Sequence, residues 1–310
     1  MNAFSLNNQW IWDHWICEYL HCYHMFYLQC PSDCGAPNQR SLHAHIGHAT
    51  SSDLDNWIEL PPALSPGPDT GFDDISLGAG CVVDKPAGGW RMFYTGITRS
   101  PYEGEHAAYA QAISWADSDD GIRFVKGQAQ ILLPDIRWYH SGSQSYPHVT
   151  MKDPFVFHYG DMWHMYFCTT LHANACSGNL TPENAAVIGY ATSPDLDIWL
   201  FQPPIITPGF FYDLHLVQAH NIAGKSYLLI SATHKEGKHG VWLIPGESML
   251  GPWECQRARP IVYDDVFGGR LFRNREGQWF YNGYTSNAPF VGTIAPKIAF
   301  NDLHQGAQTH

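Results

Sequence analysis

The chain has 310 residues, and its 17 Lys and Arg against 29 Asp and Glu give a formal net charge of −12. An acidic surface of this kind repels phosphate backbones and anionic lipid heads, which argues against nucleic-acid and membrane-surface partners. Hydrophobic residues make up 45% of the sequence and supply enough apolar material for a sizeable core, so intrinsic disorder is excluded.

The composition favours many short strands over long helices. The chain contains 28 Gly and 21 Pro, which suit turns, and its aromatic residues reach 14%. No apolar run approaches the roughly 20 residues that span a bilayer. The first residues lack the basic and apolar regions of a signal peptide. We therefore expect a cytoplasmic, all-β protein.

The 8 cysteines and 18 histidines raise the question of a metal site. Cys30 and Cys34 are spaced like half of a zinc site, but no second cysteine pair with matching spacing follows. His43 and His45 could share one face of a strand, from which His48 would point away. We expect free thiols and ordinary surface or core histidines, with no metal and no cofactor.

Five short segments with alternating aromatic residues recur along the chain, and a period of two is typical of strands with two unlike faces. Their starts lie roughly 50 to 70 residues apart, which is the spacing of propeller blades with decorated loops. They are Tyr23–Leu28, Trp90–Thr95, Trp163–Cys168, Ser226–Ser231 and Gln278–Asn282.

A second repeat follows the first three of these segments. Residues Ile46–Trp57 recur as Ile188–Trp199, with a looser copy at Ala112–Phe124. Each copy has the pattern of a strand, a polar turn around Ser-x-Asp, and an aromatic residue that opens the next strand. This hierarchy favours a five-bladed β-propeller and argues against a β-sandwich. We expect the propeller to form one domain that spans residues 1–310 and contains almost no helix. In a propeller the innermost strands converge on a central funnel, where ligand sites form.

Two carboxylates lie in apolar segments that would begin innermost strands. Asp13 lies among three tryptophans in Trp10–Trp15, and Asp153 precedes a proline in Met151–Phe157. Taken singly, each aspartate is explained better as a turn residue, because Asp is common at turns and Asp-Pro often starts one. A buried carboxylate would instead mark a functional group.

These segments resemble the five-bladed propeller glycoside hydrolases and fructosyltransferases, the invertase, levanase and levansucrase type of families 32 and 68, with family 43 arabinanases more distant. Lys152-Asp153-Pro154 is similar to the Arg-Asp-Pro motif of that superfamily, and Phe72–Val83 looks like its second-blade motif. The resemblance runs from about residue 9 to residue 300. The C-terminal β-sandwich of invertase-like enzymes is expected to be absent, because the sequence ends at His310.

The resemblance implies that Asp13 is the nucleophile and Asp153 the transition-state stabiliser. Glycoside cleavage passes through an oxocarbenium-like state, which needs a carboxylate against the anomeric carbon and gains from a second one nearby. The tryptophans around Asp13 would offer apolar faces to a sugar ring, but packing between blades explains each of them at least as well. The expected substrate contacts are Trp10, Trp12, Trp15, Asp73, Asp74, Lys152 and Gln218.

The sequence departs from the family pattern at the third catalytic position. The resemblance expects a Glu as general acid/base at the start of the fourth blade, but no Glu lies between Glu183 and Glu236. The expected position falls on His215, with Asp213 two residues earlier on the same face of a strand.

Three interpretations of this departure stay open. His215 could be the acid/base, since its unperturbed pKa near 6.5 suits proton transfer close to neutral pH. Asp213 could take the role, with His215 only binding substrate. The site could also have lost hydrolysis and kept sugar binding. Lys152 in place of the usual Arg favours an unusual substrate or a degenerate site, because Lys cannot make bidentate contacts.

The resemblance also raises the question of a cation in the propeller channel, because some relatives carry one there. His215 or His220 would be candidate neighbours of such a cation.

The sequence thus predicts a glycoside hydrolase or transglycosidase that acts on a terminal furanosyl, fructosyl-like unit of a small oligosaccharide. The alternative is a catalytically degenerate sugar-binding propeller. No nucleic acid or membrane is expected as a partner, and the sequence does not predict an oligomeric state.

Overall fold

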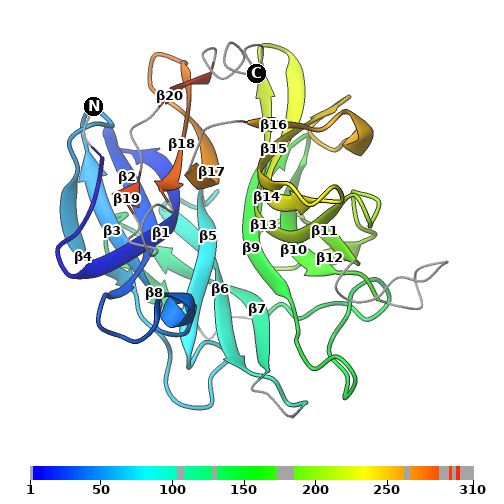
Figure 1. Cartoon of the computed structure of the whole chain (residues 1–310). Helices are drawn as coiled ribbons and strands as arrows, with labels where there is room; N and C mark the ends of the chain where they lie inside the picture. The colour runs from blue at the N-terminus through cyan, green and yellow to red at the C-terminus, as the bar shows by residue number, and fades with distance from the viewer. Residues whose placement is uncertain are drawn as a thin grey trace.

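The computed structural model consists of five antiparallel sheets that follow one another along the chain (Figure 1). The described residues are 3–102, 108–127, 131–172, 185–261, 266–285, 293–294 and 298–300.

The first two sheets are meanders of four consecutive strands. Their strands are β1 (Gln9–Tyr19), β2 (Cys22–Pro31), β3 (His45–Ser51), β4 (Ile58–Leu64), β5 (Ser76–Asp84), β6 (Trp90–Arg99), β7 (Tyr109–Ser118) and β8 (Val125–Lys126). A short 3-10 helix, η1 (Pro37–Leu42), lies between β2 and β3.

The next two sheets repeat this order. Their strands are β9 (Met151–Tyr159), β10 (Met162–Thr170), β11 (Ala186–Ser193), β12 (Leu200–Gln202), β13 (Phe211–Ile222), β14 (Lys225–His234), β15 (His239–Gly246) and β16 (Arg259–Ile261). A second 3-10 helix, η4 (Cys255–Arg257), precedes β16.

The fifth sheet differs from the regular blades that the sequence predicts. It contains β17 (Val266–Arg273), β18 (Trp279–Thr285), β19 (Thr293–Ile294) and β20 (Ile298–Ala299). Both β19 and β20 pair with β18, so they occupy one strand position in two pieces. Four complete blades are therefore present, and the fifth sheet has three strand positions in the part of the chain that the structure describes. Phe4 extends it, because its backbone pairs with Ile294 through two hydrogen bonds.

The first strand of each sheet lies innermost. β1 contacts β5, β5 contacts β9, β9 contacts β13, β13 contacts β17, and β17 returns to β1. Figure 1 shows these strands around the centre of the molecule and β4 and β12 at its edges. The all-β propeller prediction is therefore confirmed. The five alternating aromatic segments lie in the second strands, β2, β6, β10, β14 and β18, except that Gln278 lies one residue before β18.

The Ser-x-Asp repeat builds the same turn each time, between the third and fourth strands. In the first copy the Ser51 hydroxyl accepts from the Leu54 N–H, and Asp53 Oδ1 accepts from the Asn56 N–H. The copies at Asp120 and Asp195 form equivalent bonds. The carboxylate satisfies amides that the turn leaves unpaired, which explains why the motif recurs.

The glycine in two of these copies is required by a close approach between neighbouring strands. A Cβ on Gly47 of β3 would lie 2.3 Å from the Tyr27 ring of β2, and one on Gly189 of β11 would lie 2.1 Å from the Phe167 ring of β10. The aromatic second strand and the glycine of the third strand therefore fit together as one packing unit.

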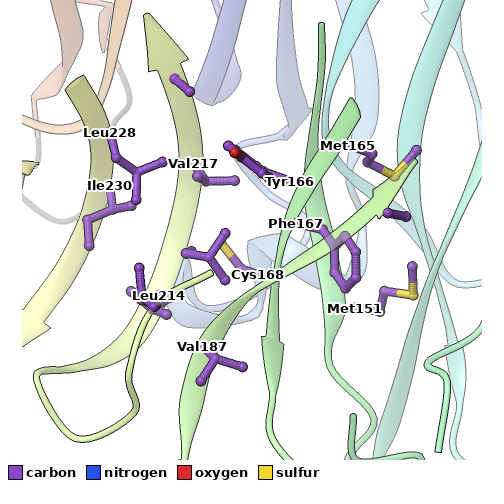
Figure 2. Close-up of a cluster of buried hydrophobic side chains, with 14 of the residues drawn as sticks. Met151, Met165, Tyr166, Phe167, Cys168, Val187, Leu214, Val217, Leu228 and Ile230 are labelled. Atoms are coloured by element: carbon purple, nitrogen blue, oxygen red, sulfur yellow. The ribbon is translucent and has the colours of Figure 1, made fainter. Parts of the chain in front are cut away.

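Buried side chains between the third and fourth sheets fix β9 against β13 (Figure 2). Met151 of β9 and Cys168 of β10 belong to the same apolar cluster as Leu214 and Val217 of β13, and each is at most 3% exposed. Each fully buried side chain of this size contributes roughly 1.5–3 kcal/mol. This packing holds together the two strands that carry Asp153 and His215.

Candidate active site

All five inner strands carry a β-bulge in their first half. The unpaired residues include Asp13 in β1, Asp153 with Pro154 in β9, and Gly268 with Gly269 in β17. Asp13 has φ 39° and Asp153 has φ 57°, a left-handed conformation that is rare for residues with a side chain. A bulge twists its strand and re-aims a side chain, so strain of this kind is typical of functional sites.

Asp13 lies in a crowded environment at this end of the inner strands. Burial and then the charge of Asp153 raise the pKa of Asp13 to about 6, while the charges of His215, Arg270 and Arg40 act in the opposite direction. The Asp13 carboxyl group therefore lies near one carboxylate and near three side chains that carry or can carry a positive charge. At neutral pH it is mostly ionised, as a nucleophile requires.

Asp153 is buried and held from two sides. Its backbone N–H donates to the Thr95 hydroxyl at 2.9 Å, and its Oδ2 accepts from the Leu216 N–H at 3.1 Å. Thr95 in turn donates to the Ala79 carbonyl of β5. These bonds tie the carboxylate to the neighbouring inner strands, which fixes its orientation.

His215 lies at the centre of a row of three polar side chains. Its Nδ1 lies 2.8 Å from Lys152 Nζ, and its Nε2 lies 2.9 Å from Asp213 Oδ1. Because an ammonium group only donates, Nδ1 accepts from Lys152 and Nε2–H donates to Asp213. His215 Nδ1 is also 3.9 Å from Asp153 Oδ2, which connects the row to the buried carboxylate.

Asp213 forms the exposed end of this row. Its hydrogen bond with His215 holds the pKa of Asp213 below its usual range. A cavity of about 230 Å³ lies beside it, and hydroxyl groups are frequent among its lining residues. These residues are Tyr146, Thr150, Lys152, Thr169, Thr170, Ala186, Asp213 and Leu214.

Arg270 is a functional candidate that the sequence analysis missed. It is 1% exposed, its Nε donates to the His14 carbonyl at 2.9 Å, and its charge interacts with those of Asp13 and Asp153. Burial lowers its pKa from the usual range. A cation fixed beside two carboxylates allows both to ionise in a dry site. The signal was an arginine directly after Gly268-Gly269, inside an apolar strand.

Arg40 of η1 was also missed, because nothing in its sequence context distinguishes it from a surface arginine. Its guanidinium lies over the Trp12 ring, 5.3 Å from the centroid, and it forms a hydrogen bond with Tyr284. Its charge also lowers the pKa of Asp13. The segment between β2 and β3 therefore contributes to the environment of the carboxylates.

The three tryptophans that were expected as substrate contacts are buried. Trp10, Trp12 and Trp15 are each at most 5% exposed and belong to the apolar cluster of the first two sheets. The alternating apolar pattern around Asp13 therefore serves packing between blades, and these rings leave little face for a sugar.

The two second-blade aspartates differ from one another. Asp73 is buried, pairs with Lys126 Nζ at 2.6 Å and accepts from the Tyr94 hydroxyl at 3.0 Å, so it stabilises the loop before β5. Asp74 accepts from the Thr70 N–H, while its Oδ1 has no hydrogen-bond partner among the residues that the structure describes. Asp74 stays a candidate substrate contact.

Gln218, another expected substrate contact, bonds with the backbone of a neighbouring inner strand. Its amide donates to the Leu271 carbonyl at 3.2 Å and accepts from the Leu271 N–H at 2.8 Å. Both ends of the amide are thus used to join β13 to β17. Lys152, also expected as a substrate contact, donates to His215 Nδ1. The roles of all these residues as substrate contacts stay predictions.

The described residues contain no cluster of three or more His, Cys, Asp or Glu that could hold a metal ion. Within the same residues, no helix is long and apolar enough to cross a membrane.

Comparison with known proteins identifies the family. The Glycosyl hydrolases family 32 N-terminal domain matches residues 7–205. Sucrose-6-phosphate hydrolase of Escherichia coli is 30% identical over 207 residues, which are 66% of this chain and 34% of that protein. Raffinose invertase of Escherichia coli is 29% identical over 184 residues, 59% of this chain and 31% of that protein. The chain thus spans about a third of the length of these relatives.

Solved structures share the fold over nearly the whole chain. Inulosucrase from Halalkalicoccus jeotgali bound to kestose superposes with a TM-score of 0.73 at 20% identity, covering 97% of this chain and 80% of that chain. Fructan 1-exohydrolase IIa from Cichorium intybus gives a TM-score of 0.70 at 16% identity, covering 96% of this chain and 57% of that chain. Because the family model matches more than half of the chain, the chain belongs to the family named Glycosyl hydrolases family 32 N-terminal domain.

Proposed function

We propose that the chain is a glycoside hydrolase or transglycosidase that acts on a terminal fructosyl-like unit of a small saccharide. The observation that supports this most is the convergence of Asp13, Asp153 and His215 from three inner strands, with the first two on bulges. The names of the family relatives, which refer to sucrose, raffinose and fructan, support the same substrate class.

In this proposal Asp13 attacks the anomeric carbon and forms a glycosyl-enzyme, which water or a second sugar then resolves. Asp153, whose Oδ2 already accepts from the Leu216 N–H, would use its other oxygen to hold sugar hydroxyls as positive charge develops. The positive charge of Arg270 would offset the negative charges of the two carboxylates and keep Asp13 ionised near neutral pH.

Of the two candidate acids, the geometry favours His215. Hydrogen bonding keeps the pKa of Asp213 low, so this carboxylate holds no proton to donate near neutral pH. His215 donates from Nε2 to Asp213, which lines the hydroxyl-lined cavity. To act as the acid, His215 must first take up a second proton on Nδ1, in place of the hydrogen bond from Lys152. The imidazolium then passes its Nε2 proton to a leaving-group oxygen that replaces Asp213 as acceptor, and a neutral imidazole remains.

The second candidate function is sugar binding without turnover. The observation in its favour is that Lys152 Nζ lies 2.8 Å from His215 Nδ1, so this nitrogen accepts a hydrogen bond at the place where an acid would have to carry a proton. A product screen separates the two functions. Sucrose, fructo-oligosaccharides, arabino-oligosaccharides and algal galactans are incubated with the chain, and released sugars are measured. Turnover supports the enzyme, and thermal stabilisation by a saccharide without turnover supports the binding protein.

A further inference from the structure

Cys30 and Cys34 lie together in the turn that leaves β2. Their Sγ atoms are 3.4 Å apart, and Cys30 has no exposed surface whereas Cys34 is partly exposed. Of the seven cysteines in the part of the chain that the structure describes, these are the two whose sulfurs lie within hydrogen-bonding distance of one another. Cys17 and Cys22 instead face backbone carbonyls.

The backbone of the turn keeps the two thiols together. The Cys34 N–H donates to the Pro31 carbonyl at 3.1 Å, and the Ser32 N–H donates to the Asn8 carbonyl at 3.0 Å. A disulfide requires the sulfurs to close to about 2.05 Å. Only side-chain rotation and a small local shift are then needed, because the chain already turns back on itself at this point.

We propose that Cys30 and Cys34 form a reversible disulfide by exchange with a low-molecular-weight disulfide, and that this bond clamps the segment that carries Arg40. The proposal concerns a modification site and does not require the sugar chemistry described above.

The exchange proceeds in two balanced steps. The Cys34 thiolate attacks one sulfur of the small disulfide, whose S–S bond breaks and releases a first thiolate. Cys30 then attacks the Cys34 sulfur of the mixed disulfide and releases a second thiolate. The two cysteine protons pass to the released thiolates, so the cysteine pair loses two electrons and the small disulfide becomes two thiols.

The order of attack follows from the surroundings of each thiol. Cys34 is accessible to a reagent in solution, and Cys30 is not. Burial raises the pKa of Cys30 to about 12, while the charge of Arg40 acts in the opposite direction. Cys34 is therefore the entry point and Cys30 the resolving thiol.

The clamp would act on a segment that reaches the carboxylates. η1 begins at Pro37, three residues after Cys34, and its Arg40 rests on Trp12 next to Asp13. A bond between Cys30 and Cys34 fixes the start of this segment to β2. Opening of the segment in solution would then be rarer, because one of its ends loses conformational freedom.

The test uses the full chain and oxidised glutathione as the probe. After incubation, free thiols are alkylated and peptides are mapped by mass spectrometry. We expect the peptide with Cys30 and Cys34 to lose two hydrogens, to escape alkylation and to recover with dithiothreitol. Cys34→Ser should abolish the reaction, and Cys30→Ser should trap glutathione on Cys34. Cys22→Ser, a partly exposed cysteine without a thiol partner, is the matched control and should leave the bond unchanged.

Limited trypsin digestion tests the clamp. Cleavage after Arg40 should be at least about threefold slower in the oxidised wild type than in the reduced form, with no such difference in Cys34→Ser. Alkylation of both thiols after oxidation, stable glutathione on Cys34 in the wild type, or an Arg40 cleavage rate unaffected by oxidation would each overturn the proposal.

Discussion

Arg270 of β17 donates from Nε to the backbone carbonyl of His14 in β1 at 2.9 Å, across 256 positions of the sequence. This bond joins the last inner strand to the first and leaves a buried cation beside Asp13, the residue that precedes His14. The same side chain therefore connects the last blade to the first and supplies a positive charge to the candidate site.

The pKa of Asp13 predicts the acid limb of activity. Because a nucleophile must be ionised, kcat/KM should fall below about pH 6, tenfold for each pH unit. The Arg40 charge lowers this pKa, so Arg40→Gln should raise it and move the limb to higher pH by about half a unit. The pH profile of kcat/KM measures the shift. Arg137→Gln, at an exposed arginine paired with Asp135, is the control. A limb that stays in place or moves to lower pH contradicts this account of Asp13.

His215 and Asp213 can be separated by substitution. If His215 is the proton donor, His215→Ala should lower kcat by roughly 10²–10⁴-fold on a natural saccharide, and Asp213→Asn should cost much less. The loss for His215→Ala should shrink on an aryl fructoside, whose leaving group needs little protonation. Steady-state kinetics on both substrates measure this. An equal loss on both substrates would show that His215 acts by binding instead.

Buried neutral histidines predict acid sensitivity. Burial lowers the pKa of His14 to about 4 and the pKa of both His48 and His220 to about 3. Since the unfolded chain binds these protons near pH 6.5, the free energy of unfolding should fall as pH drops from 6.5 toward 4. Each group contributes about 2 kcal/mol between pH 6.5 and 5. Asp13, whose pKa is raised, acts in the opposite sense below pH 6.

Urea unfolding of His48→Phe at pH 7.5 and pH 5 tests this directly. The His48 ring stacks on Phe26 and on His24, and its Nε2 bonds with His24 Nδ1 at 2.9 Å. Phe keeps the stacking and loses this hydrogen bond at both pH values. We expect the difference in unfolding free energy between the two pH values to shrink by about 2 kcal/mol. His158→Phe, at an exposed histidine, should leave that difference unchanged. A wild-type protein that is equally stable at both pH values would rule out the histidines as the cause.

Arg91 links the second sheet to the third. Its Nε donates to Asp117 Oδ1 at 2.7 Å and its Nη1 to Asp197 Oδ1 at 2.5 Å, with Arg91 itself 8% exposed. Arg91→Met should therefore lower the free energy of unfolding by about 1–3 kcal/mol. The matched change Arg137→Met, at an exposed ion pair within one loop, should cost clearly less, because water screens this pair. If both variants lowered the free energy of unfolding by the same amount in urea, the bonds of Arg91 between the two sheets would not stabilise the fold more than an exposed ion pair does.

The strand order could be predicted because local patterns carry it. The alternating aromatics mark each second strand, and the Ser-x-Asp turn marks the step from the third strand to the fourth. The split of β19 and β20 leaves no such pattern, so a fifth regular blade was expected where the structure has an irregular sheet. The single-domain assignment of residues 1–310 and the cytoplasmic location stay predictions.

The candidate site could be predicted only in part. Asp13, Asp153 and His215 stand out as polar residues in apolar strands, and they do lie on inner strands. The bulges that re-aim them depend on pairing between strands and leave no local signal. Arg40 and the burial of the tryptophans depend on contacts distant in sequence, which composition and spacing do not encode.

The most direct test of the central claim is kcat/KM of the wild type against Asp13→Asn on the saccharide that the wild type turns over fastest. Saccharide affinity is measured in parallel by calorimetry. We predict that Asp13→Asn, which keeps the shape of the side chain, loses at least about 10³-fold in kcat/KM while saccharide affinity changes little. Turnover that survives Asp13→Asn, or a wild type that binds saccharides and turns none over, would contradict the assignment of Asp13 as nucleophile.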